Sequence, residues 1–389
     1  MYNFDKTIIR KGTNSLKWDM VANKYKNDNL LPMWVADMDF EVAPGISEAI
    51  KKRAEHVTYG YTFPSDDFYK SIIDWNRKRN NYEIKKEWIT VCNGVVPSMK
   101  AAILGFTEKN DKVLINTPVY PPFHQSVVSL KRELVTNSLV FDGEKYVMDF
   151  DDFERKIKTG VKLYLLSSPH NPLGKLWSKE ELEKIVDICY ENNVKILSDE
   201  IHSDIIYWGN KHVVINTVSE KAKNISIVCA APSKTFNIAG LSASYVIVEN
   251  EVMRKQMWDT MSEMGIKSIN LFGLTASEAA YSLGEKWLEE MLEYLEENID
   301  FVCDYIYEKL PEVKVFKPQS TYLMWLDFRK YNLTQEKLMN KLINEAQVVL
   351  NSGTDFGEEG NGFVRLNIGC PRSMLKQCLD QINEVFSNR

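Results

Sequence analysis

Residues 225–240 read ISIVCAAPSKTFNIAG, an apolar run that leads directly into a turn carrying one lysine, Lys234. The run is short and rich in aliphatic and β-branched residues, as is typical of a strand buried on both faces of a parallel sheet. A lysine beside apolar walls loses hydration that favours its charged form, so its amine can become nucleophilic. The competing interpretation is an ordinary surface lysine.

Three further apolar runs, at residues 113–115, 161–166 and 194–197, have the same character. Between the last two, Ser178 and Glu181 have capping-box spacing, and apolar residues then recur at helical spacing as far as Asn192. This alternation predicts an α/β fold with a mostly parallel central sheet flanked by helices. Because loops at the carboxyl ends of parallel strands face one crevice, we expect functional residues there.

The pattern changes after Gly284. Residues 287–295 place an apolar stripe on an acidic helix, and residues 322–328 alternate as an antiparallel strand does. We predict three parts: an N-terminal segment at 1–45 associated with the small domain and active site, a large domain at 46–284, and a smaller α/β domain at 285–389.

Composition narrows the function classes. The 389 residues carry a net charge of −6, which argues against nucleic-acid binding and for a small-molecule partner. The longest uninterrupted apolar run is far shorter than the roughly 20 residues of a membrane-spanning helix, so no membrane association is expected. Six cysteines without a CxxC pair predict free thiols and a cytoplasmic location. Zinc-ligand spacings and phosphate-loop motifs are missing, so no metal is expected.

Polar residues follow several predicted strands. Asp199, Glu200 and His202 form only a weak metal-binding motif, because alternate residues of a strand point to opposite faces. A simpler function for the Asp199 carboxylate is to face the nitrogen of a heterocyclic ligand. An aspartate that merely caps the next element is the structural alternative. Gly94, followed by Val95 and Val96, opens a helix whose free N–H groups suit a phosphate, although many such turns bind nothing.

For two polar side chains and two aromatic clusters, the sequence allows both a ligand-binding role and a purely structural role. Asn171 lies in a turn-rich stretch and is either a rigidly aimed amide or part of a plain loop. Arg365, inside an apolar strand, requires a carboxylate partner, from a ligand or from a structural salt bridge. The aromatic clusters at residues 34–40 and 59–61 are typical of a core or an interface, and either role could place them beside a flat ring.

Together these motifs resemble the fold-type I pyridoxal-phosphate enzymes, and more narrowly the cystathionine β-lyases and cysteine C–S lyases of the MalY/PatB family. The resemblance covers nearly the whole chain and is carried by residues 12–19, 33–40, 59–62, 93–97, 118–120, 168–174, 198–204, 232–240 and 365–369. It implies pyridoxal 5′-phosphate as cofactor, a large and a small domain, and a homodimer with shared active sites.

The resemblance also implies roles for individual residues. Lys234 holds the cofactor as a Schiff base, Asp199 pairs with the pyridine nitrogen, and Tyr120 stacks on the ring. The other cofactor-binding positions are Gly94, Val95, Val96, Asn171, His202, Ser233 and, from the second subunit, Tyr61. The substrate is bound by Arg365, Asn171 and Tyr61.

We therefore expect a C–S β-lyase that cleaves L-cystathionine or a related cysteine S-conjugate to a thiol, pyruvate and ammonia. The alternatives are an aminotransferase of the same superfamily and a regulatory, partner-binding protein that keeps the fold. Two departures from common aminotransferases favour the lyase: His202 stands where a tyrosine is usual, and Ser242 where a phosphate-binding arginine is usual.

Overall fold

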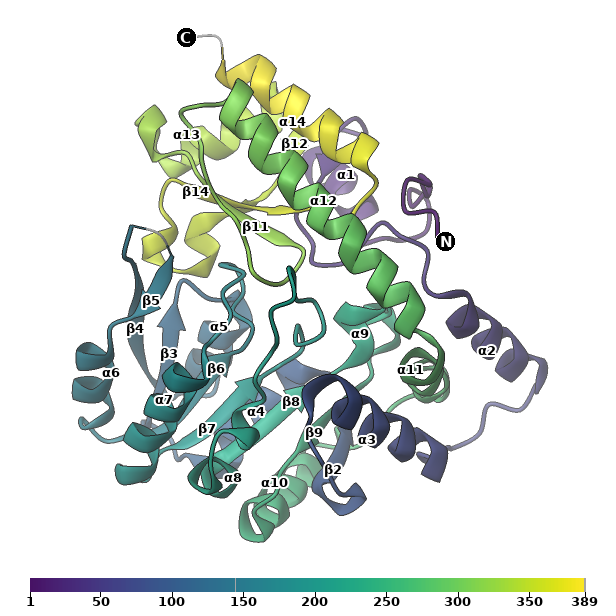
Figure 1. Ribbon diagram of the computed structural model, residues 1–389, viewed down its shortest axis with the longest axis vertical. Helices are drawn as coiled ribbons and strands as arrows, with labels where there is room; N and C mark the ends of the chain where they lie inside the picture. Colours follow the sequence, from purple (N-terminus) through teal and green to yellow (C-terminus); the bar gives the residue numbers. More distant parts are fainter. Residues whose placement is uncertain (144, 388–389) are drawn as a thin grey trace.

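The computed structural model describes residues 1–143 and 145–387 (Figure 1). Its larger sheet has the strand order β2, β9, β8, β7, β6, β3, β4, β5. In that order the strands are Ile89–Cys92, Ser244–Ile247, Ser226–Ala230, Lys195–Asp199, Val161–Ser167, Lys112–Thr117, Glu133–Phe141 and Tyr146–Met148. The run from β8 to β4 is parallel, which confirms the predicted sheet. Of the three antiparallel strands that complete the sheet, β2, β9 and β5, the last two were not predicted.

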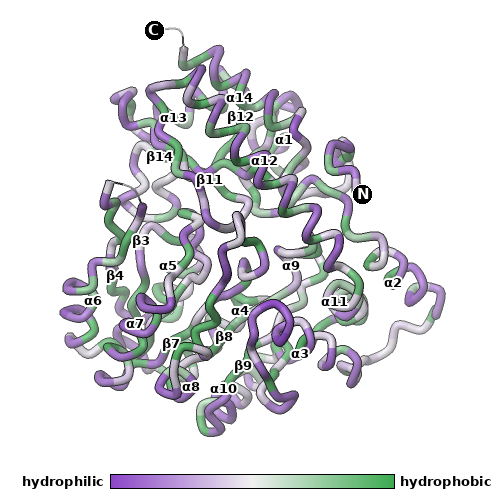
Figure 2. Tube along the Cα trace, viewed as in Figure 1, coloured by the Kyte–Doolittle hydropathy of each residue, from purple (hydrophilic) through white to green (hydrophobic). Residues whose placement is uncertain are grey.

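Side chains on β6 alternate between two hydrophobic clusters on opposite faces of the sheet. Leu163 and Leu165 pack in the cluster that contains α4 (Val95–Phe106), α5 (Pro121–Ser129) and α10 (Glu251–Glu263). Tyr164 and Leu166 belong to the other cluster. Burial on both faces explains why the strand has a continuous apolar sequence. Figure 2 shows the hydrophobic strands β7 and β8 behind helices that are partly hydrophilic.

Other helices around this sheet are α2 (Pro44–Glu55), α3 (Asp66–Asn80), α6 (Phe150–Ile157), α7 (Lys179–Glu191), α8 (Glu220–Ile225), α9 (Pro232–Thr235) and α11 (Leu271–Leu283). The predicted capping box of α7 is confirmed, because Ser178 and Glu181 exchange side-chain and backbone hydrogen bonds. Among the described helices, none combines the length and the apolar composition that crossing a bilayer requires.

The smaller sheet is antiparallel, with β10 (Lys314–Phe316), β11 (Leu323–Asp327), β14 (Phe363–Asn367) and β13 (Asn351–Ser352) in this order. It packs with α12 (Glu285–Lys309), α13 (Gln335–Asn340) and α14 (Arg372–Phe386). Figure 1 shows α12 passing from the neighbourhood of α11 to the top of the molecule beside α14. The predicted acidic helix after Gly284 and the strand within residues 322–328 are thus confirmed.

The N-terminal part contains α1 (Asp19–Tyr25) and β1 (Leu31–Pro32), which pairs in parallel with β12 (Val348–Val349). Residues 33–40, here called the strap, continue from β1. The strap accepts a backbone hydrogen bond from Asn367 at Met33 and donates one from Asp39 to Gly369. It also contacts Asn237, near the end of α9. The strap is therefore hydrogen-bonded both to the end of β14 in the smaller sheet and to the turn after α9, which follows β8 of the larger sheet. The division of the chain at residues 45 and 284 stays a prediction.

Candidate active site

The carboxyl edge of the larger sheet holds the residues predicted for the site. Asp199 is the last residue of β7, and Tyr120 lies between β3 and α5. Lys234 lies in α9, a one-turn helix that follows β8. Lys234 and Tyr120 both line a cavity of about 980 Å³. The common direction of the strands thus brings together side chains that are distant in the sequence.

The amine of Lys234 is partly buried and donates a hydrogen bond to the Ala36 carbonyl at 2.6 Å. Burial lowers the pKa of the amine to about 8; the charge of Arg365 adds to this effect, while Asp37 and Asp199 oppose it. A larger fraction of the amine is therefore neutral at neutral pH than in an exposed lysine. The interpretation of Lys234 as an ordinary surface lysine is wrong.

Asp199 is buried, and among the residues that the structure describes no basic side chain forms an ion pair with it. Burial raises the pKa of the carboxyl to about 7, and the charge of Glu200 adds to this rise. Oδ1 accepts the Ile201 N–H at 3.2 Å, a turn contact that a purely structural aspartate would also make. A buried carboxylate without a cationic partner is costly, so binding of a cation beside it is favourable.

The neighbouring Glu200 is fully engaged in the protein. Its carboxylate accepts hydrogen bonds from Ser198 Oγ at 2.8 Å and from the Ile215 N–H at 3.2 Å, and it pairs with His212 Nε2 at 2.7 Å. Over residues 1–143 and 145–387, no group of three potential metal ligands of the His, Cys, Asp or Glu type is found. Glu200 therefore supports the end of β7 and does not join His202 in a site.

His202 is buried, and its Nδ1 has no hydrogen-bond partner within the described chain. Burial lowers the pKa of the imidazole to about 3, and the charges of Lys234 and Arg365 add to this effect. The ring is thus neutral in the protein and presents a polar nitrogen that a ligand could satisfy.

Arg365 is buried on β14, and its guanidinium is bound by neutral oxygens. Nη1 donates to Asn171 Oδ1 at 3.0 Å, and Nη2 donates to the Trp34 carbonyl at 2.9 Å and to Asn351 Oδ1 at 2.6 Å. Nε is buried without a partner, and Arg365 has no ion pair in the part of the chain that the structure covers. The alternative of a structural salt bridge is therefore not found, and the charge remains available to an incoming carboxylate.

Three predicted phosphate-binding positions lie at the N-terminus of α4. No side chain caps this helix at Gly94, so the first N–H groups of its twelve-residue length have no side-chain acceptor. Gly94 has φ +156°, which favours glycine there. Ser233 lies in α9 next to Lys234.

The predicted contribution of Tyr61 is not made within this chain. Tyr61 is completely exposed, and Tyr59 and Phe63 on the same segment are also exposed. The core interpretation of this aromatic cluster is therefore wrong. An interface position remains the prediction for it.

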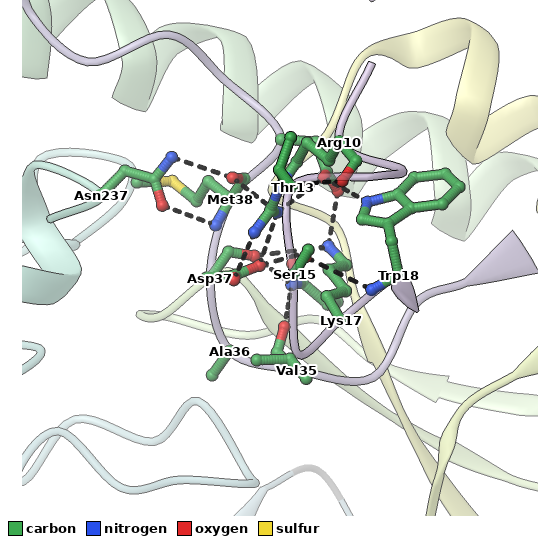
Figure 3. A network of polar contacts seen from close by, with 12 residues as sticks. Arg10, Thr13, Ser15, Lys17, Trp18, Val35, Ala36, Asp37, Met38 and Asn237 are labelled. Carbon is green, nitrogen blue, oxygen red and sulfur yellow. Dashed lines mark hydrogen bonds and ion pairs between the residues drawn. The ribbon is translucent and has the colours of Figure 1, made fainter. Parts of the chain in front are cut away.

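A network of charges fixes the strap beside the cavity (Figure 3). Arg10 forms a two-pronged contact with Asp37 at 2.7 and 2.9 Å and also reaches Asp39 at 2.8 Å. Fully buried Lys17 donates to Asp39 at 2.6 Å. On the other side of the strap, the Asn237 amide exchanges two hydrogen bonds of 2.9 Å with the Met38 backbone. The strap is thus held between the N-terminal segment and the turn that carries Lys234.

Replacing Asp39 with asparagine is expected to lower the free energy of unfolding by about 3 kcal/mol, because Lys17 keeps its buried charge and loses its main partner. Urea unfolding measures the change. The matched control is Glu41→Gln, whose exposed pair with Lys6 is worth at most about 1 kcal/mol. Equal effects of the two substitutions would contradict a structural role of the buried pair.

The same pair predicts a pH dependence. Burial would raise the pKa of Asp39, but Lys17, Trp18 and Arg10 outweigh this effect and lower it below the usual 3.8. The contribution of Asp39 to stability is therefore present above pH 3.8 and is lost as the pH falls below it. Unfolding curves of Asp39→Asn should lack this acid-dependent part.

Sequence reasoning missed three contributors to the site. Tyr322 was read only as the start of an apolar strand, yet its hydroxyl donates to the Ala36 carbonyl at 2.9 Å. The Asn237 amide and the carbonyls of the strap were also missed. Hydrophobic patterning carries no signal for such contacts, because they depend on where a hydroxyl or carbonyl points in three dimensions.

The family model for aminotransferase class I and II matches residues 22–382 of this chain. Among curated relatives, the cystathionine beta-lyase PatB of Bacillus subtilis (strain 168) is 40% identical over 386 residues, which cover 99% of this chain and 100% of the relative.

Two solved structures extend this similarity to the fold. A PLP-bound protein of Clostridium difficile 630, named as an aminotransferase, has a TM-score of 0.97 and 46% identity, and the match covers 99% of this chain and 100% of that one. The PLP-bound C-S lyase of Staphylococcus hominis has a TM-score of 0.92 and 32% identity, with 100% of both chains covered.

Proposed function

The chain belongs to the class I and II aminotransferase family, and from this premise we propose that it is a pyridoxal-phosphate-dependent carbon–sulfur β-lyase. Its substrates are L-cystathionine or related cysteine S-conjugates. The reaction consumes one water and yields a thiol, pyruvate and ammonia. The observation that carries the proposal is the Lys234 amine, whose pKa is lowered, within electrostatic range of Asp199, a buried carboxylate that forms no ion pair in residues 1–143 and 145–387.

The side chains of the crevice fit the cofactor. Asp199 offers a buried carboxylate to a protonated ring nitrogen, and His202 offers a buried nitrogen that has no hydrogen-bond partner among the described residues. The uncapped N-terminus of α4 at Gly94, Val95 and Val96, with Ser233 nearby, offers N–H and hydroxyl donors to a phosphate. Tyr120 supplies an aromatic face on the wall of the same cavity.

When bound, pyridoxal phosphate supplies an aldehyde that captures amino groups and a ring that accepts electron density. With the cofactor bound, Lys234 would hold its aldehyde, and the free amine at Nζ would take the Cα proton of the substrate as general base. Asp199 would keep a proton on the nitrogen of the cofactor ring. Arg365 binds the α-carboxylate through its guanidinium, which Asn171 orients. The β-thiolate then leaves with the electrons of the broken C–S bond.

We also retain three finer proposals. Tyr61 reaches the site of a second copy in a homodimer, which its complete exposure supports. The chain divides into an N-terminal segment at 1–45 associated with the small domain and active site, a large cofactor-binding domain at 46–284 and a small domain at 285–389. A cytoplasmic location is supported by six cysteines, none of which forms a disulfide among the described residues.

Pyruvate release without an added keto acid tests the activity. The purified protein with pyridoxal phosphate is expected to form pyruvate and thiol in equal amounts from L-cystathionine. The aminotransferase alternative has support from the name of the C. difficile relative and from the shared steps up to Cα deprotonation. Turnover only when a keto acid is added, with an amino acid as its product, would establish that alternative and reject the lyase.

A further inference from the structure

The hydroxyl of Tyr322 shares an acceptor with the amine of Lys234. Tyr322 lies directly before β11 with 1% of its surface exposed, and Oη donates to the Ala36 carbonyl at 2.9 Å. The Nζ atom of Lys234 donates to this same carbonyl at 2.6 Å. A carbonyl oxygen has two lone pairs, so it can accept both donors. The Ala36 carbonyl of the strap therefore links Tyr322, which lies just before β11, to Lys234, which lies in the helix after β8.

The turn that presents Tyr322 is held in an unfavourable backbone conformation. Thr321 has φ +65°, which is a genuine outlier for a β-branched residue and persists only where its surroundings enforce it. The Thr321 N–H donates to the Ile205 carbonyl at 2.9 Å, and Tyr207 Oη donates to the Thr321 carbonyl at 2.7 Å. The turn is thus hydrogen-bonded to the segment that follows His202, whose ring lies 6.1 Å from the ring of Tyr322.

Charged groups face Lys234 from three directions. Asp37 faces it from the strap, Asp199 from β7 and Arg365 from β14. Tyr322 faces two of them, Asp37 and Arg365. None of the hydrogen bonds found in the described residues ties Nζ directly to these charges, and the bond to Ala36 is the one that fixes the direction of the amine.

We propose that Tyr322 is a positioning residue that holds the Ala36 carbonyl as the resting acceptor for the Lys234 amine whenever the cofactor releases it. The hydroxyl donates to one lone pair of the Ala36 carbonyl oxygen. This weakens the hydrogen bond that the same oxygen accepts from the ammonium form of Lys234, and so limits how far that form is stabilised. The freed amine stays aimed by one hydrogen bond and remains able to accept the Cα proton. This inference rests on the proposed function, because the lysine must alternate between holding the cofactor and acting as a base.

Tyr322→Phe tests the proposal, because it removes the hydroxyl and keeps the ring. Without the competing Tyr322 donor, the Ala36 carbonyl accepts a hydrogen bond only from the ammonium form of Lys234. That form is then more stable, and the pKa of the Lys234 amine should rise by about 0.5–1 unit. Acetic anhydride labelling of Lys234 in the full-length, cofactor-free chain, followed by peptide mass spectrometry over a pH series, measures this shift. In the holoenzyme, kcat should fall about fivefold with KM unchanged, and the acid limb of its pH profile should move to higher pH.

The matched control is Tyr245→Phe, which removes another buried hydroxyl, hydrogen-bonded to Tyr281 at 3.1 Å and not lining the cavity. The control should keep the labelling midpoint and kcat. If Tyr322→Phe behaves like this control, the proposal is overturned.

A second variant covers the case in which Tyr322→Phe does not fold. Tyr207→Phe removes only the bond to the Thr321 carbonyl and should give a smaller shift of the same sign. An unchanged labelling midpoint in that variant also overturns the proposal. Labelling requires no turnover, so the two failures are distinguishable: an unchanged midpoint in a protein that releases pyruvate overturns this inference alone. A shifted midpoint in a protein that forms no pyruvate rejects the lyase assignment and supports only the positioning of the amine by Tyr322.

Discussion

Lys234→Ala is expected to lower kcat/KM for pyruvate formation from L-cystathionine by at least about 10⁴-fold. The substitution removes both the group that holds the cofactor and the base for the Cα proton. Its structural basis is an amine whose pKa is lowered to about 8 and which one hydrogen bond aims into the crevice. Coupled pyruvate detection over a range of substrate concentrations measures the loss.

Lys195→Ala provides a matched control for this substitution. Lys195 is also partly buried, but it begins β7 at the end opposite to Asp199. Its replacement should leave kcat/KM within about twofold, because surface and edge substitutions away from a site have small effects. A small added amine should restore part of the rate of Lys234→Ala by replacing the missing base. Full activity of Lys234→Ala without such an amine would contradict the mechanism.

Asp199→Asn is expected to lower kcat by about 10³-fold, because the crevice loses the fixed negative charge that keeps a proton on the cofactor ring. Asp199→Glu, which keeps the charge and displaces it, should retain more activity than the asparagine variant. The ratio of the two kcat values separates loss of charge from loss of shape. Equal activity of both variants would mean that the charge of Asp199 has no part in the chemistry.

The same substitution should have the opposite effect on the stability of the cofactor-free chain. Because the pKa of Asp199 is raised from 3.8 to about 7, its stabilising contribution is present below pH 3.8 and is lost as the pH rises through about 7. Asparagine does not ionise, so cofactor-free Asp199→Asn should have a higher Tm than the wild type above neutral pH. At low pH the two Tm values should converge.

Local patterns predicted the parts of the fold that local physics determines. The capping box at Ser178 and the apolar run of β6 are readable because hydrogen bonds and burial there depend on neighbours in the sequence. The antiparallel strand β9 was not predicted, because its pairing with β2 and β8 depends on distant segments.

The residues of the candidate site also fall into two groups, those that local sequence patterns predict and those that depend on contacts between distant segments. Lys234 and Asp199 were predicted because they directly follow or end buried strands, where the sheet exposes its carboxyl edge. Tyr322 and Asn237 act through hydrogen bonds to the backbone of the strap: Tyr322 donates one to the Ala36 carbonyl, and the Asn237 amide makes three, to Met38 and Phe40. These partners are 286 and 197–199 residues apart in the sequence. No spacing rule links such partners. Contacts of this kind follow only from the packing of the strap between the two sheets.

Reductive trapping of the holoenzyme tests the central claim most directly. The protein is saturated with pyridoxal phosphate, treated with borohydride and digested, and the modified peptide is identified by mass spectrometry. The account predicts a pyridoxyl group on Lys234 and its disappearance in Lys234→Ala. Modification of a different lysine, or no stable modification despite excess cofactor, would contradict it.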